Sequence, residues 1–246
     1  MLTVGVDGCK AGWLSVSLRA PGGCGASGDG TAGPDGASLS WAVHASLPAL
    51  LASPDGRAAA MVVVDVPVGL TEGPPRPCDR EARQVLGLRR SSVFTPPMRA
   101  MLGMESREAA SRHGRGVRQG GGLSAQAWNI VPKIAEADRA LAPAMQARVR
   151  EGHPEVAFAR LGGAPMAAAK RTPAGRAERL AVLARHGLRA EGALDAVRAV
   201  RPRPAAPDDV LDACALALTG RDALAGRAWV LGGQRDARGL IMEILG

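Results

Sequence analysis

Four aspartates are the residues of this chain whose positions could support chemistry. Asp7 follows the apolar run Leu2–Val6, and Asp65 ends a second apolar run. Asp209 and Asp212 are three residues apart, so a helix would place both carboxylates on one face. Carboxylates gathered without a cation repel one another, and their pKa values rise. Magnesium or manganese would relieve this repulsion, and two ions about 4 Å apart could activate water and stabilise the leaving oxygen of a phosphodiester.

Ordinary structural roles are also open to some of these acids. Asp7 could be a hydrogen-bonded aspartate of the glycine turn that follows it. Asp208 is a good N-cap for the last long helix, and Asp209 would interact favourably with the dipole of that helix. Asp212 has no such role, because it lies a full turn inside the helix among apolar residues.

The elements that position these acids alternate between strands and helices, which indicates an α/β domain. Strands are predicted at Leu2–Val6, Leu14–Leu18, Leu39–His44, Met61–Asp65, Ala147–Glu151 and Ala228–Leu231, with a short last segment at Ile241–Ile244. Helices are predicted at Leu47–Ala52, Arg80–Leu88, Glu105–His113, Ser124–Ala142, Arg176–His186, Leu194–Val200 and Asp208–Thr219, with a further helix start at Pro154. The glycine-rich segment Pro21–Ser38 cannot bury enough apolar surface to order itself, so we expect a mobile loop there.

The chain is basic, with a formal net charge of +8. Residues 76–118 contribute most of it, since ten arginines against four acids give +6. Two interpretations remain open for this segment: a solvated helical insertion, or a basic cap that binds an anionic partner over the acidic strand ends. Basic residues that could contact a substrate are Lys10, Arg83, Arg89, Arg90 and Lys170.

Cysteine spacing and hydropathy bear on the location of the protein. Cys9, Cys24, Cys78 and Cys214 form no CxxC pair, which suits a reducing cytoplasm. Asp7 lies where a signal peptide would need its apolar region. A membrane span needs about 18 apolar residues in a row, and no apolar run of the sequence approaches that length. We therefore expect a cytoplasmic protein without membrane contact.

Several motifs together resemble the bacterial family known as "domain of unknown function 429", described as predicted nucleases with an RNase H fold. They are VGVDGCKAGW, VDVPVGL, CDREAR with LGLRRSSVFTPP, SAQAWNI, EGHPEVAF, KRTPAGR and DDVLDACALA, and they extend from residue 4 to about residue 217. The late D-x-x-D helix looks most like that of RuvC-type resolvases. The resemblance implies a single RNase H-like domain over residues 1–246, with a mixed five-stranded sheet flanked by helices and a basic helical insertion at about 71–145 after the fourth strand. It also implies that Glu151 or Glu155, which lie in a family motif, could join the aspartates.

We therefore expect a nuclease that hydrolyses nucleic acid by a two-metal mechanism. Asp7, Asp65, Asp209 and Asp212 would hold Mg²⁺ or Mn²⁺, and Glu155 completes the expected catalytic set. One alternative is a phosphate-binding, nucleotide-binding or phosphotransfer protein, because sugar kinases and actin-like ATPases share this fold and its D-G turn. Those proteins pair two such domains and add a second glycine-rich motif, which this sequence lacks. The other alternative is a non-catalytic nucleic-acid-binding relic that keeps the acids without binding metal.

Overall fold

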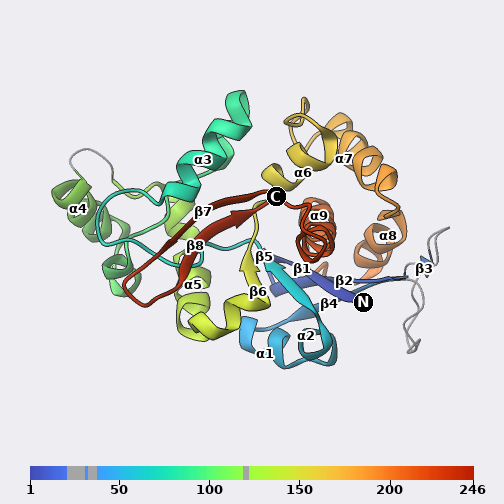
Figure 1. Ribbon diagram of the computed structural model, residues 1–246, viewed down its shortest axis with the longest axis horizontal. Coiled ribbons are helices and arrows are strands. Elements are labelled where there is room, and N and C mark those ends of the chain that lie inside the picture. The colour runs from blue at the N-terminus through green and yellow to red at the C-terminus, as the bar shows by residue number, and fades with distance from the viewer. Residues whose placement is uncertain (21–30, 33–37, 119–121) are drawn as a thin grey trace.

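A mixed β-sheet forms the centre of the computed structural model, which describes residues 1–20, 31–32, 38–118 and 122–246 (Figure 1). The spatial order of its strands is β3 (Thr31–Ala32), β4 (Ser38–His44), β2 (Gly12–Arg19), β1 (Leu2–Cys9), β5 (Met61–Val64) and β6 (Val149–Glu151). β1 pairs antiparallel with β2 and parallel with β5, and β5 pairs parallel with β6. The predicted mixed five-stranded α/β sheet is confirmed, and the two-residue β3 is added at its edge.

Helix α9 (Pro207–Leu224) covers one face of the sheet, and three further helices lie around it (Figure 1). These are α6 (Pro154–Gly162), α7 (Pro173–Arg185) and α8 (Glu191–Ala199). Val16 and Val63 of the sheet pack there against Leu211 and Leu216 of α9, and none of the four side chains is more than 1% exposed. α9 is apolar on nearly all sides because helices and the sheet surround it, which fits a helix at the centre of the domain.

The opposite face of the sheet packs against α1 (Leu47–Ala52), α2 (Pro54–Ala58) and α5 (Ala125–Ala140). Val62 and Val64 point to this face, whereas Met61 and Val63 point toward α9. The alternation follows from the two-residue period of a strand. A strand buried on both faces needs apolar residues at every position, as the MVVV sequence of β5 provides.

Between β5 and β6 the chain is mainly helical. It forms α3 (Pro77–Leu86), the 3₁₀ segments Gly87–Ser92 and Arg99–Gly103, α4 (Arg107–Arg118), α5 and the 3₁₀ segment Pro143–Ala147. α3 begins three residues before the predicted start, because Pro77 occupies its first turn, where a missing N–H has no cost. α4 is instead shifted toward the C-terminus, by two residues at its start and five at its end.

The two C-terminal segments pair with each other, which the sequence did not predict. β7 (Val230–Arg235) and β8 (Ile241–Leu245) form a separate antiparallel hairpin that reaches away from the main sheet (Figure 1). Met242 and Ile244 of β8 pack against α3 and α6, which gives the hairpin its own small core. The predicted mobile loop at Pro21–Ser38 lies outside the described residues apart from positions 31–32 and 38. No helix in the described part of the chain is long and apolar enough to cross a membrane.

Candidate active site

Alternation along β1 directs Asp7 toward α9. Thr3, on the same face, donates its Oγ1 hydrogen to the Ala217 carbonyl of α9 at 2.9 Å. Gly5 lies so close to the helix that a Cβ atom there would be 1.9 Å from the Ala213 carbonyl oxygen. Asp7 is two residues further along this face, so its carboxylate lies beside the first half of α9. The strand continues through Asp7 to Cys9, which corrects the predicted end at Val6.

Asp65 lies next to Asp7 at the same end of the sheet. Val64 pairs with Val6, and the Asp65 N–H donates to the Val6 carbonyl at 2.8 Å. Val63 faces α9, and alternation therefore places Asp65 on that side as well. The parallel pairing of β1 with β5 thus brings two carboxylates to one edge.

The two aspartates of α9 have different surroundings. Asp212 is 1% exposed and accepts a hydrogen bond from Lys170 Nζ at 2.8 Å. Asp209 accepts the backbone N–H of Ala206 at 2.8 Å, and this bond caps the first turn of the helix. The helix begins at Pro207, so the expected N-cap at Asp208 was wrong by two residues.

Asp7, Asp65 and Asp212 line one cleft of about 520 Å³. We call these three residues the carboxylate cluster. Other described residues that line the cleft include Arg89, Phe94, Lys133, His153, Glu155, Lys170 and Arg171. Asp209, although it was predicted as a fourth ligand, is not among the described residues of the lining.

Burial and mutual repulsion raise the pKa values of the cluster. Burial, and then the charge of Asp212, raise the pKa of Asp65 to about 7. Burial, and then Asp65 and Asp212, raise the pKa of Asp7 well above its ordinary value. Burial also raises the pKa of Asp212, although Lys170 opposes it. Burial alone would lower the pKa of Lys170, but the charge of Asp212, its hydrogen bond and the charges of Asp7 and Asp65 together raise that pKa. The cluster is therefore a place where negative charge accumulates at a free-energy cost.

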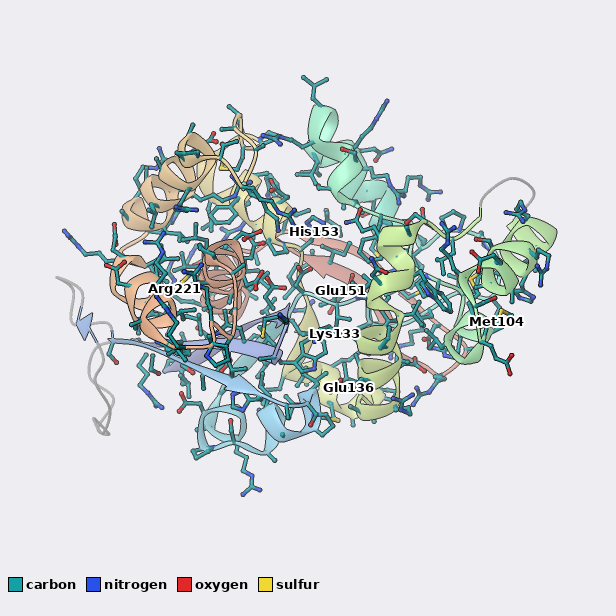
Figure 2. All side chains as sticks on the ribbon, turned by 180° about the vertical axis from the view of Figure 1, so that it is seen from behind. Met104, Lys133, Glu136, Glu151, His153 and Arg221 are labelled. Atoms are coloured by element: carbon teal, nitrogen blue, oxygen red, sulfur yellow. The ribbon has the colours of Figure 1, made fainter. Side chains whose placement is uncertain are left out.

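Lys133 of α5 forms part of the wall of the cleft opposite α9. Figure 2 shows Lys133 and His153 in the central region between α5 and α9. Lys133 Nζ donates to the Gly12 carbonyl at 2.5 Å and lies 4.4 Å from the centre of the Trp13 ring. Trp13 Nε1 donates in turn to Glu136 at 3.1 Å, which ties α5 to the β1–β2 hairpin.

The sequence interpretation missed Lys133 and His153 as residues of the cleft. The signal for Lys133 was its spacing from Gln126 and Ile130, because positions four and then three apart share one helix face. Nε2 of His153 lies 3.4 Å from the Ser92 carbonyl, and the His153 side chain also lines the cleft.

Glu155 reaches the cleft from the first turn of α6. Its Oε1 accepts a hydrogen bond from Arg179, which is completely buried. Within the described residues, Oε2 of Glu155 and Nδ1 of His153 are buried without a hydrogen-bond partner. Two residues that line the cleft therefore each keep one buried polar atom without a hydrogen-bond partner.

Glu151 has a structural role on the other side of the sheet. Both of its carboxylate oxygens accept hydrogen bonds from Arg76 at 2.7 Å, and Oε2 also accepts the Val68 N–H at 2.6 Å. Arg76 is 2% exposed and pairs with Asp79 as well. This buried network fixes the turn that follows Asp65, so Glu151 supports the site without lining the cleft.

The basic residues predicted to contact substrate divide into two groups. Lys170 and Arg89 line the cleft, although Arg89 also donates to the Met166 and Ala167 carbonyls at 2.8 Å each. Arg83 instead bonds to the Val93 carbonyl and Thr95 Oγ1, both at 3.0 Å. Lys10 and Arg90 are exposed and are not part of the described lining.

No three His, Cys, Asp or Glu side chains are arranged to hold a metal ion, as far as the structure describes the chain. The bond between Lys170 and Asp212 engages one of the three carboxylates of the cluster.

Comparison with known proteins identifies a family for nearly the whole chain. No curated protein and no solved structure matches it. The model of one family matches residues 5–237, which include every member of the carboxylate cluster. The chain therefore belongs to the family described as "Protein of unknown function (DUF429)".

Proposed function

We propose that this protein is a divalent-metal-dependent nuclease that hydrolyses phosphodiester bonds in the cleft. The observation that supports this most is the convergence of Asp7, Asp65 and Asp212 from three separate elements. Each carboxylate makes ionisation of the others less favourable, so the cluster opposes folding. Groups held together at such a cost are typical of a site whose charge a ligand offsets.

The residues present fit one divalent ion by charge and by donor type. Three ionised carboxylates and the Lys170 ammonium leave two negative charges, and one divalent ion balances them. Magnesium commonly uses one or two protein carboxylates together with water and substrate phosphate, so Asp7 and Asp65 suffice as ligands. When bound, such an ion would lower the pKa of water and stabilise negative charge on the phosphate.

Side chains around the cluster would orient the reacting groups. Glu155 Oε2 can accept a proton from water, and Arg179 holds its other oxygen in place. Lys133 and Arg171 place positive charge on two sides of the cleft, where phosphate oxygens would lie. The side chain of Arg171 is 86% exposed, so it is accessible to a substrate that approaches from solvent.

A second basic hollow favours a nucleic acid over a small phosphoester. Arg107, Arg112 and Arg115 of α4 line a hollow of about 480 Å³, together with Ser124 at the start of α5. The same helix continues from there to Lys133 in the cleft. Positive charge beside the start of α5 and again at Lys133 in its middle suits an extended polyanion whose phosphates contact several cations.

One observation favours the non-catalytic alternative. The ion pair of Lys170 with Asp212 satisfies the most buried carboxylate of the cluster without any metal. In a relic, internal contacts of this kind would satisfy all three acids. Manganese binding at Asp7 and Asp65 distinguishes the nuclease from the relic, because a relic would not bind manganese there.

The test is a cleavage assay with labelled single-stranded and duplex DNA and RNA, with and without Mn²⁺. We expect metal-dependent cleavage by the natural protein and none above background by Asp65→Asn, since an amide holds a divalent ion poorly. Asp195→Asn is the matched control, because the Asp195 side chain is 74% exposed on α8. Equal cleavage by Asp65→Asn, or none by the natural protein with any of these substrates, would contradict the proposal.

A further inference from the structure

Lys170 differs from the other cations that line the cleft, because it forms an ion pair with a member of the carboxylate cluster. Its Nζ is 2.8 Å from Asp212 Oδ2 and 3.9 Å from Asp208 Oδ2. Among the other described cations of the lining, Arg89 and Lys133 donate to backbone carbonyls, and Arg171 pairs with Asp208. The Lys170 side chain therefore already supplies a positive charge next to the carboxylate cluster.

Side chains from two other segments hold the loop that carries Lys170. The N–H groups of Ala167 and Ala168 donate to the two carboxylate oxygens of Glu178, at 2.8 and 2.9 Å. Arg89 donates to the carbonyls of Met166 and Ala167. Arg179 donates to the Ala168 carbonyl at 3.4 Å. Because these five hydrogen bonds hold the three residues before Ala169, the lysine side chain starts from a defined position.

A fixed ammonium at Asp212 changes how many ions the cluster can hold. The ammonium already neutralises Asp212, and one divalent ion neutralises Asp7 and Asp65. A second divalent ion would leave an excess of two positive charges and would compete with the ammonium for the same carboxylate. Like charges at such short range in a buried site are strongly unfavourable.

We propose that the site binds a single divalent ion, at Asp7 and Asp65, and that the Lys170 ammonium takes the place of the second ion of a two-metal site. This inference rests on the proposed function and concerns the same cleft. The bond to Asp212 uses one of the three N–H donors of the ammonium, so the group can also donate to a phosphate oxygen. The cluster would then position a phosphate between one ion and one lysine.

Calorimetric titration with Mn²⁺ tests the stoichiometry directly. We expect one ion per chain in the natural protein and in Lys170→Arg, which keeps the charge. Lys170→Gln should bind two ions, because Asp212 is released and the local charge falls by one. Arg171→Gln is the matched control: it removes the adjacent charge, which pairs with Asp208 outside the cluster, and should leave one ion.

Two results would overturn the inference: two ions in the natural protein, or one ion of unchanged affinity in Lys170→Gln. Circular dichroism of each variant shows whether it is folded, and the stoichiometry of the natural protein decides the question even if Lys170→Gln fails to fold. The outcomes also separate the two proposals. One ion without cleavage of any nucleic acid would overturn the nuclease and leave this inference standing, whereas no Mn²⁺ binding by any variant would overturn both.

Discussion

Replacing Asp65 with asparagine is expected to stabilise the metal-free protein, although the carboxylate belongs to the proposed active site. The physical reason is the pKa of Asp65, which burial and then Asp212 raise from 3.8 to about 7. An ionised Asp65 is therefore less stable in the folded chain than in the unfolded chain. Asparagine has nearly the same shape and no charge, so it removes this penalty.

The size of the effect follows from the pKa difference. A pKa difference of one between the folded and unfolded chain corresponds to about 1.4 kcal/mol. The pKa of Asp65 differs by about three, so its ionisation lowers the free energy of unfolding by on the order of 4 kcal/mol. This value is an upper limit, because Asp65 is partly exposed in the cleft and water screens its charge. The titrations of the three acids are linked, because the pKa of Asp7 is raised as well: when one acid of the cluster is protonated, the others ionise more easily. The natural cluster can therefore relieve part of its repulsion without a substitution, which reduces the effect of Asp65→Asn.

The difference in stability between Asp65→Asn and the natural protein should depend on pH. Between the unfolded and folded pKa values, the folded state binds more protons, so the natural protein loses stability as pH rises toward about 7. The advantage of Asp65→Asn should therefore be complete at about pH 8, and less than half of it should remain at about pH 5. Urea unfolding at several pH values, with metal removed by chelation, measures both quantities.

In the presence of manganese, the natural protein should be more stable than Asp65→Asn, the reverse of the order without metal. An ion that binds only the folded state stabilises it by mass action, and Asp65→Asn should gain much less from Mn²⁺ than the natural protein does. The surface variant Asp195→Asn should follow the natural protein throughout. Two results would refute the assigned electrostatics of the cluster. One is that Asp65→Asn is less stable than the natural protein at about pH 8 without metal, and the other is that the stabilities of the two proteins change with pH in parallel.

Two further predictions concern the framework around the site. Burial alone would raise the pKa of Asp222, but hydrogen bonds from Arg160 and Arg227 and the charges of Arg221 and Arg160 together lower it. The stabilising effect of the ionised Asp222 is therefore lost only as pH falls below the unfolded pKa of 3.8. Asp222→Asn should therefore lower the free energy of unfolding at neutral pH by about 1–3 kcal/mol in urea titrations, and an unchanged midpoint would contradict this. Gly5→Ala should cost at least about 1–3 kcal/mol in the same assay, because its Cβ would lie 1.9 Å from the Ala213 carbonyl oxygen; near-natural stability would show that α9 can move away from β1.

The sequence was sufficient to predict the members of the carboxylate cluster, because their positions follow from local periodicity. Asp7 and Asp65 each come two residues after a residue that faces α9, and strand alternation preserves that direction. Asp212 was identified because no local structural role explained it. Asp209 differs, since its carboxylate caps the backbone of its own helix, whereas the sequence indicated only a favourable interaction with the helix dipole.

The basic residues were harder to predict, because the partner of a long side chain depends on tertiary packing. Arg83 bonds to a carbonyl ten residues further along the chain, and Arg89 bonds to a loop about eighty residues away. No periodicity in the sequence encodes such contacts. The hairpin of β7 and β8 was missed for a related reason, since its small core is shared with α3 and α6.

The geometry of the site depends on packing that involves none of its acids. α9 approaches β1 closely because Gly5 faces Ala213 and Ala217, whose side chains are small, and Thr3 bonds across the same contact. This contact is buried and has little freedom to move, so it holds Asp212 near Asp7 despite their repulsion. The stability lost in the cluster is thus offset by the adjacent helix–strand contact. A variant that loosens this contact should lower the pKa values of the acids and weaken cation binding together, since both depend on how closely the carboxylates are held.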